Sequence, residues 1–342
     1  MRAHIRTVVV LALSVGMLAW FLRGADLRAV WTEIQDGRVG LLALALGVTG
    51  MTYVFRALRW QYLLHPLGTP PFSAVFRATV IGFAVSTLLP ARAGEVVRPY
   101  LLARRAGFSA TSAFATIILE RVLDLITVLL LFGFYLAFYT PAVAAGHSAT
   151  FAALKSGGLL AAVASVAGLV FMMVVAGHPE KLASWALRVE RVLPARIATA
   201  MAHLVRTFLE GLAVVRQPRR LAIAGLLSLP LWLSIALGIW STSRAFHIEM
   251  AYPGAFLMMA VLVVGVAVPT PGAVGGFHKA YQIGAMAFFG VANDRAVGAA
   301  LVLHAISFVP VTIGGAIFLA QEGLSLSGVR GLAMRDAPED AA

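Results

Sequence analysis

Three charged side chains stand in an otherwise apolar stretch of this chain: Arg92, Glu95 and Arg98. Their spacing of three brings Glu95 within reach of an arginine if the segment after Gly94 is helical. A charged side chain at the centre of a bilayer costs roughly 2.5–3.5 kcal/mol, so three of them require mutual pairing, water or an anionic ligand. Two arginines against one glutamate leave a positive site, and the forked donors of arginine can grip two phosphate oxygens. We therefore expect this segment to bind an anionic, phosphate-bearing group.

The segment recurs in altered form about 181 residues later. A repeated, broken, charged hairpin at membrane depth is how transporters build a substrate site. In the alternative interpretation, Arg92 and Arg98 lie at the membrane–water boundary and only anchor a hairpin, but the recurrence counts against it. A gapless superposition pairs Pro90 with Pro271, Gly94 with Gly275, Arg98 with Lys279 and Tyr100 with Tyr281.

The second copy contains prolines and glycines that cannot form a regular helix. Its glycines let backbone amides approach a ligand closely, and such amides at the start of a half-helix suit an anion. Two basic residues, His278 and Lys279, follow directly in the sequence. The residues that we expect this hairpin to contribute to the site are Pro271, Gly272, Gly275, Gly276, His278 and Lys279.

A further ionisable cluster, Glu120, Arg121 and Asp124, opens a long apolar segment. Arg121 and Asp124 can pair at a spacing of three, and a cluster inside the membrane indicates function by default. The alternative is a salt-bridged helix start near the cytoplasmic surface. The corresponding position of the second copy carries His304, which we expect to be a packing residue.

Arg56 and Arg59 close another apolar segment beside Tyr53 and Trp60. Arginines and aromatic residues at a cytoplasmic boundary are common as membrane anchors. We expect these two arginines to anchor the helix at the interface, with headgroup binding as the alternative.

The composition is that of a polytopic membrane protein, since 60% of the 342 residues are hydrophobic and only 12% are charged. The net charge of +12 is explained by a basic cytoplasmic face rather than by nucleic-acid binding, because no polar basic domain exists. With no cysteine, disulfides and Cys-ligated metals are excluded. No metal or catalytic motif stands out, so we expect no cofactor, no metal and no enzymatic activity of its own.

Six apolar segments are long enough to cross a bilayer, and two pairs of shorter ones flank the repeated motif. The short pairs, Ala78–Leu89 with Tyr100–Leu119 and Ala255–Val268 with Ala280–Val291, are predicted to be re-entrant hairpins. If they add no crossings, the repeats, at about 39–140 and 221–321, are inverted; if each adds one, the repeats are parallel. We favour the inverted arrangement. The predicted spans are Thr7–Leu22, Val39–Phe55, Val122–Thr140, Ser156–Gly177, Leu221–Ser243 and Ala296–Gln321.

The fold class is therefore an all-α polytopic membrane protein, with one integral-membrane domain over residues 1–325 and a disordered cytoplasmic tail at 326–342. Placing both termini in the cytoplasm puts 20 of the 27 Lys and Arg residues inside. Residues 180–220 form a cytoplasmic connector, and Asp26–Gln35 lies on the opposite side. Apolar residues of the connector recur at helical spacing, which predicts an amphipathic helix: Ile197, Met201, Leu204, Phe208, Leu212 and Val215.

Three motifs in this order resemble the lysylphosphatidylglycerol synthase transmembrane family, also called the flippase-like domain family. They are Pro90-x-Arg92-x-Gly94-Glu95-x-x-Arg98, Glu120-Arg121-x-x-Asp124 and Pro271-Gly272-x-x-Gly275. The resemblance covers nearly the whole chain and implies an inner-membrane protein that moves lipids. The sequence shows no aminoacyl-transferase domain like that of the multiple peptide resistance factors, which argues against lipid synthesis. His278 stands where the family carries a glutamate, and Ala273 replaces a glycine.

The expected function is that of a lipid flippase or lipid-carrier transporter of the cytoplasmic membrane. Its expected partners are membrane lipids with an anionic headgroup or a polyprenyl phosphate, bound where the hairpin tips meet. The first alternative is a lipid-binding subunit that does not transport and assists a separate glycosyltransferase or lipid synthase. The second is an enzyme acting on a lipid-linked phosphate, with Glu95 or Asp124 as the base. The sequence leaves the oligomeric state, the lipid and the direction of transport open.

Overall fold

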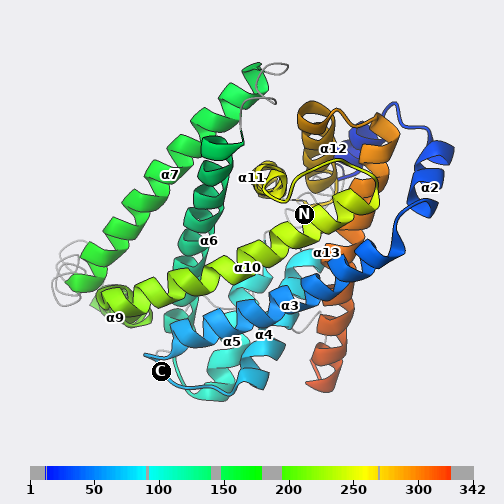
Figure 1. Ribbon diagram of the computed structural model, residues 1–342. Coiled ribbons are helices and arrows are strands. Elements are labelled where there is room, and N and C mark those ends of the chain that lie inside the picture. Colours follow the sequence, from blue (N-terminus) through cyan, green and yellow to red (C-terminus); the bar gives the residue numbers. More distant parts are fainter. Residues whose placement is uncertain are drawn as a thin grey trace.

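The computed structural model describes residue 12 and residues 14–89, 92–139, 148–178, 195–268 and 270–324, among which every regular element is a helix (Figure 1). The fold class is therefore all-α, as predicted. Several predicted features lie outside the described residues: Pro90, the start of the Thr7–Leu22 span, residues 180–194 of the connector, and the tail at 326–342.

Four helices are long and apolar enough to cross a membrane, which makes this a multi-pass membrane protein. Each contains one of the predicted spans. A fifth predicted span, Val122–Thr140, begins inside α6 (Ala110–Phe138), which has 29 residues and carries the charged cluster near its middle. The number of crossings remains a prediction. The four helices are α3 (Val39–Leu64), α7 (Ser148–Gly177), α10 (Pro218–Ala245) and α13 (Asn293–Gln321).

Two halves of the chain repeat one order of elements: a long helix, two short helices and a second long helix. The first half runs α3, α4 (Phe72–Leu88), α5 (Gly94–Ala106) and α6. The second half runs α10, α11 (Gly254–Ala267), α12 (Gly276–Phe289) and α13. Within each half the two short helices pack against each other. The first short helix of each half also packs on the last long helix of the other half, α4 on α13 and α11 on α6.

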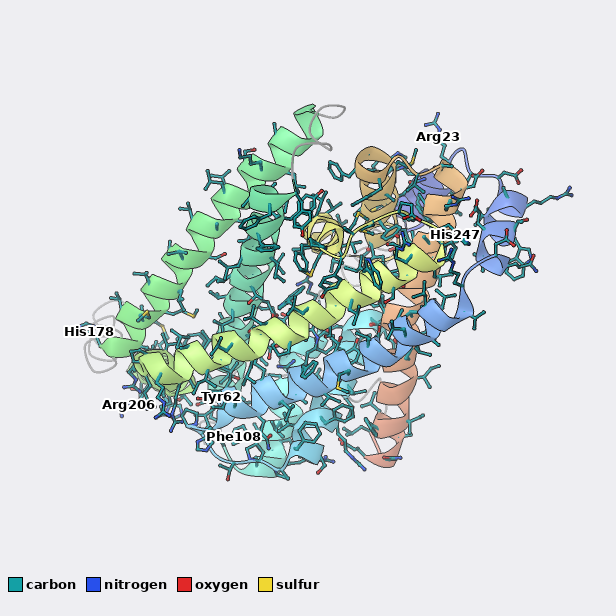
Figure 2. All side chains as sticks on the ribbon, viewed as in Figure 1. Arg23, Tyr62, Phe108, His178, Arg206 and His247 are labelled. Atoms are coloured by element: carbon teal, nitrogen blue, oxygen red, sulfur yellow. The ribbon has the colours of Figure 1, made fainter. Side chains whose placement is uncertain are left out.

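The two halves meet along α3 and α10, which run antiparallel over their full lengths (Figure 1). The amide of Arg38, at the start of α3, donates to the carbonyl of Ala245 at the end of α10 over 3.0 Å. Midway, the hydroxyls of Thr52 and Ser234 lie 2.8 Å apart. Figure 2 shows Tyr62 near one end of this helix pair and His247 near the other.

One predicted segment, Tyr100–Leu119, is wrong as a single element. α5 ends at Ala106, and Gly107 adopts a left-handed conformation with φ 73° that closes the helix. Ser109 then caps α6 by accepting from the amide of Thr111. By contrast, the predicted Ala255–Val268 segment agrees with α11 to within one residue at each end.

Glycines let the two arms of each hairpin cross closely. A Cβ on Gly94 would overlap the carbonyl oxygen of Gly82, and a Cβ on Gly276 would overlap that of Gly265. The equivalent crossings therefore pair Gly94 with Gly276. In both hairpins the glycine at the start of the second arm is needed for backbone contact with the first.

The glycine crossings correct the gapless superposition of the two motifs by one residue. A Cβ added to Gly82 would lie 2.7 Å from the Cβ of Arg98, whereas one added to its counterpart in the second hairpin, Gly265, would meet the Cβ of Ala280. Arg98 thus corresponds to Ala280 and not to Lys279. Arg92 (φ 52°) and Ala273 (φ 55°) match in the gapless superposition and share a left-handed conformation. The one extra residue of the second loop therefore lies after Ala273.

Replacing Gly94 with alanine is expected to destabilise the first hairpin by about 1–3 kcal/mol, because the added methyl group must push α4 and α5 apart. The measurement is the midpoint of thermal unfolding in detergent. Gly133→Ala is the matched control, since Gly133 lies inside α6 with nothing within 4 Å of its would-be Cβ. Equal midpoints for the two variants would contradict the close crossing.

The described part of the connector contains the predicted helix, α9 (Ala195–Gly211), but it packs on the protein body as well. The Ser112 hydroxyl of α6 donates to the carbonyl of Thr207 over 2.7 Å, and Leu209 and Leu212 are buried. Leu204, expected on the same apolar stripe, is 54% exposed. The other predicted surface segment, Asp26–Gln35, contains the helix α2 (Leu27–Gln35).

Candidate functional site

A cavity of about 550 Å³ lies where the two halves meet, and both hairpin tips line it. The tips touch: Nη2 of Arg92 donates to the carbonyl of Val266 at the end of α11 over 3.2 Å. Gly272 of the second tip lies against Thr87 of α4. The prediction that the two broken segments come together is therefore confirmed.

The charged part of the lining is one-sided. Among the described residues, four arginines and two acidic residues line the cavity, and all six come from the first half. The second half supplies a largely apolar wall, with Leu262 and Val263 from α11, Phe277 from α12, and Leu303 and Phe308 from α13. The charged lining residues are Arg56, Arg92, Glu95, Arg98, Arg121 and Asp124.

A buried ion network supports the charged side of the cavity. Nη2 of Arg98 lies 2.7 Å from Oε2 of Glu120, and these side chains are 3% and 0% exposed. Arg121 binds the other oxygen of Glu120 over 2.6 Å and also lies 3.3 Å from Asp124. The guanidinium of Arg98 stacks over the ring of Trp60 at 4.0 Å. Because charges removed from water must be paired, this network fixes the geometry of the wall.

Glu95 and Arg92 form a looser pair at the exposed side of the cavity. Their closest charged atoms lie 3.9 Å apart, and Arg92 is 51% exposed. Glu95 also faces Arg121 at 3.8 Å, which connects this pair to the buried network. The contact between Glu95 and an arginine three residues away agrees with the prediction from spacing.

Arg59 is not an interface anchor, so that interpretation is wrong for this residue. Its side chain is fully buried, and Nη1 lies 2.6 Å from Asp124 and 2.8 Å from the hydroxyl of Ser228. Glu120 lies 3.5 Å from Nη2. The sequence placed Arg59 near the end of a shorter span, but α3 continues to Leu64, which carries the arginine into the interior.

Arg56 also points inward, onto the wall of the cavity, with only 9% of its surface exposed. Its guanidinium stacks on the ring of Phe83 at 4.7 Å. Nη1 is buried without a hydrogen-bond partner in the described part of the chain. Arg56 is therefore positioned to meet a ligand.

Of the residues expected from the second hairpin, Gly272 lines the cavity, whereas the others do not. Nδ1 of His278 accepts from the amide of Gly275 over 3.2 Å, so this histidine caps α12. Lys279 lies over the ring of Trp20 at 4.7 Å.

His304 is a packing residue as expected, with Nε2 2.7 Å from the carbonyl of Gly272. Pro271, Gly275 and Gly276 shape the loop and its crossing with α11.

Sequence reasoning missed the contribution of α10 to the site. Nε1 of Trp232 donates to Oδ1 of Asp124 over 2.8 Å, and the Ser228 hydroxyl reaches Arg59. Ser234 lines the cavity opposite Thr52. The available signal was a tryptophan and several serines inside an apolar span, since buried polar groups need partners.

Comparison with known proteins agrees with this architecture. The chain matches the family described as Lysylphosphatidylglycerol synthase TM region over residues 7–315. It is also 25% identical over 348 residues to Glycosyltransferase AglD of Haloferax volcanii, covering 95% of this chain and 55% of that protein. The chain thus spans about half the length of this relative. Because the family match covers nearly the whole chain, the protein belongs to the lysylphosphatidylglycerol synthase TM region family.

Proposed function

We propose that this protein is a lipid flippase or lipid-carrier transporter of the cytoplasmic membrane and has no enzymatic activity of its own. The observation that carries the proposal is the cavity between the halves, with its charges on one wall and apolar side chains on the other. An amphipathic ligand fits such a lining, with its anionic headgroup at the arginines and its chain along the apolar wall. Membrane family membership supports a lipid-related role.

In this proposal α4–α5 and α11–α12 are re-entrant hairpins, and the halves are inverted repeats with six full crossings. The antiparallel α3–α10 pair and the exchanged packing of α4 and α11 support a twofold relation between the halves. Broken backbone at membrane depth is tolerated where it lines a polar cavity, as Gly272 does here. Both termini lie in the cytoplasm.

The proposal predicts that Arg92→Ala or Glu95→Ala lowers the transfer of labelled phosphatidylglycerol in proteoliposomes by about tenfold or more. Arg92→Ala removes a charge-assisted contact to the headgroup, whereas Glu95→Ala removes the carboxylate that holds Arg92 and Arg121 in place. Both variants are expected to fold, since their ion pair is long and partly exposed. Arg105→Ala is the control: Arg105 pairs with Glu322 outside the cavity lining. Wild-type transfer by the folded Arg92 and Glu95 variants would contradict the proposal.

A second candidate is a lipid-binding subunit that assists a separate glycosyltransferase or lipid synthase without transporting. The similarity to a protein named as a glycosyltransferase, of which this chain spans about half, favours it. In that case the purified protein binds lipid but transfers none, and it co-purifies with an enzyme in constant ratio. The proteoliposome assay separates the two candidates.

A further inference from the structure

Arg56 differs from the other deeply buried arginines of the described chain. Arg59 and Arg98 lie within 2.7 Å of a carboxylate. Arg56 is 9% exposed, but no carboxylate in the described part of the chain lies within 4.0 Å of it. Its stacking partner, Phe83, holds the guanidinium plane but does not neutralise the charge. A buried, unpaired cation is costly, so an anion is the missing partner.

The charge of the lining indicates how much negative charge is missing. Among the described residues, four arginines and two carboxylates line the cavity, which leaves two positive charges in excess. The fully buried pair behind the lining, Arg59 and Glu120, does not change this excess. A ligand group with two negative charges balances the site, whereas a group with one leaves a positive charge enclosed.

From Arg56 and this excess, we infer that the cavity selects lipids that end in a phosphomonoester or diphosphate, and that Arg56 determines this selectivity. A phosphomonoester carries about 1.5 to 2 negative charges near neutral pH, whereas a phosphodiester carries one. The apolar wall formed by Leu262, Phe277 and Phe308 accepts the chain of the lipid. This inference rests on the proposed lipid site and specifies its ligand class.

The test compares two lipids that have the same chains and differ in the phosphate ester. Purified full-length protein in detergent is titrated at pH 8 with dioleoyl phosphatidic acid, a monoester, and with dioleoyl phosphatidylglycerol, a diester. We expect the wild-type protein to bind phosphatidic acid about tenfold more tightly. Arg56→Gln is expected to remove most of this preference, and Arg56→Lys to retain part of it.

Arg77→Gln is the matched control, because Arg77 also lies on an aromatic ring, that of Phe318 at 5.2 Å, but does not line the cavity. It should keep the full preference. Equal wild-type affinity for the two lipids overturns the inference, whatever the folding of the variants. An unchanged preference in folded Arg56→Gln overturns the role of Arg56.

Binding and transport fail separately in this design. A monoester preference without transfer in proteoliposomes retains the inference and rejects the flippase proposal. Transfer of phosphatidylglycerol by a protein without the monoester preference retains the flippase proposal and rejects the inference.

Discussion

Glu120→Gln is expected to destabilise the folded protein by about 3–5 kcal/mol, the range for removing one partner from a buried ion pair. Glu120 is fully buried, and its carboxylate contacts Arg98 over 2.7 Å, Arg121 over 2.6 Å and Arg59 over 3.5 Å. A neutral amide leaves Arg98, which is 3% exposed, without a carboxylate partner, and removes negative charge that also faces Arg59 and Arg121. We expect a large fall in the unfolding midpoint, or loss of the monodisperse peak in detergent.

A matched exposed pair provides the control for this prediction. Glu33 accepts from Arg295 over 2.8 Å, but the two side chains are 24% and 39% exposed. Glu33→Gln should cost less than about 1 kcal/mol, because exposed ion pairs contribute little. If Glu120→Gln and Glu33→Gln have the same unfolding midpoint, the buried network does not hold the charged wall in place.

A double variant tests whether the loss comes from unpaired charge rather than from lost packing. Adding Arg98→Met to Glu120→Gln removes one of the cations that Glu120 neutralises. The double variant is expected to be more stable than Glu120→Gln alone, since an uncharged buried pair carries no such penalty. Additive losses would instead indicate a packing effect.

The helices that contain strong local signals were predicted well. The apolar run of α11 ends at a stretch of proline and glycine, and its bounds were correct to one residue. The break between α5 and α6 also had local signals, a glycine at 107 and a helix-capping Ser109, but the apolar run around them masked both. Local signals fail where one apolar run continues through a turn.

The site was predicted in part, because its charges come from segments far apart in the chain. Arg92, Glu95 and Arg98 share one motif, and Asp124 belongs to a second. The inward position of Arg56 follows from the antiparallel packing of α3 on α10, which no spacing rule shows. The one-residue shift of Arg98 onto Ala280 depends on where the glycines cross. Tertiary packing, not local pattern, decides these features.

Cross-linking the two hairpin tips is expected to lower lipid transfer by about tenfold or more, if transport requires the tips to part. The tips touch where Thr87 of α4 lies against Gly272, since a Cβ on Gly272 would be 3.3 Å from Cγ2 of Thr87. The chain has no cysteine, so Thr87→Cys with Gly272→Cys introduces a single defined pair. Cβ atoms at about 3.5–4.5 Å suit a disulfide. Transfer is measured in proteoliposomes before oxidation, after it, and after reduction.

Each single-cysteine variant, oxidised in the same way, controls for damage to the cavity wall, because both residues line it. Cysteine at Gly272 must adopt φ 59°, so the reduced double variant gives the reference rate. Loss on oxidation and recovery on reduction indicate that the halves separate at the tips during transport. If the oxidised protein transfers lipid at the reduced rate, the tips stay together, and the headgroup must cross along a fixed groove beside the arginines. Where oxidation abolishes transfer, retained lipid binding in the oxidised state distinguishes a locked transporter from a destroyed site.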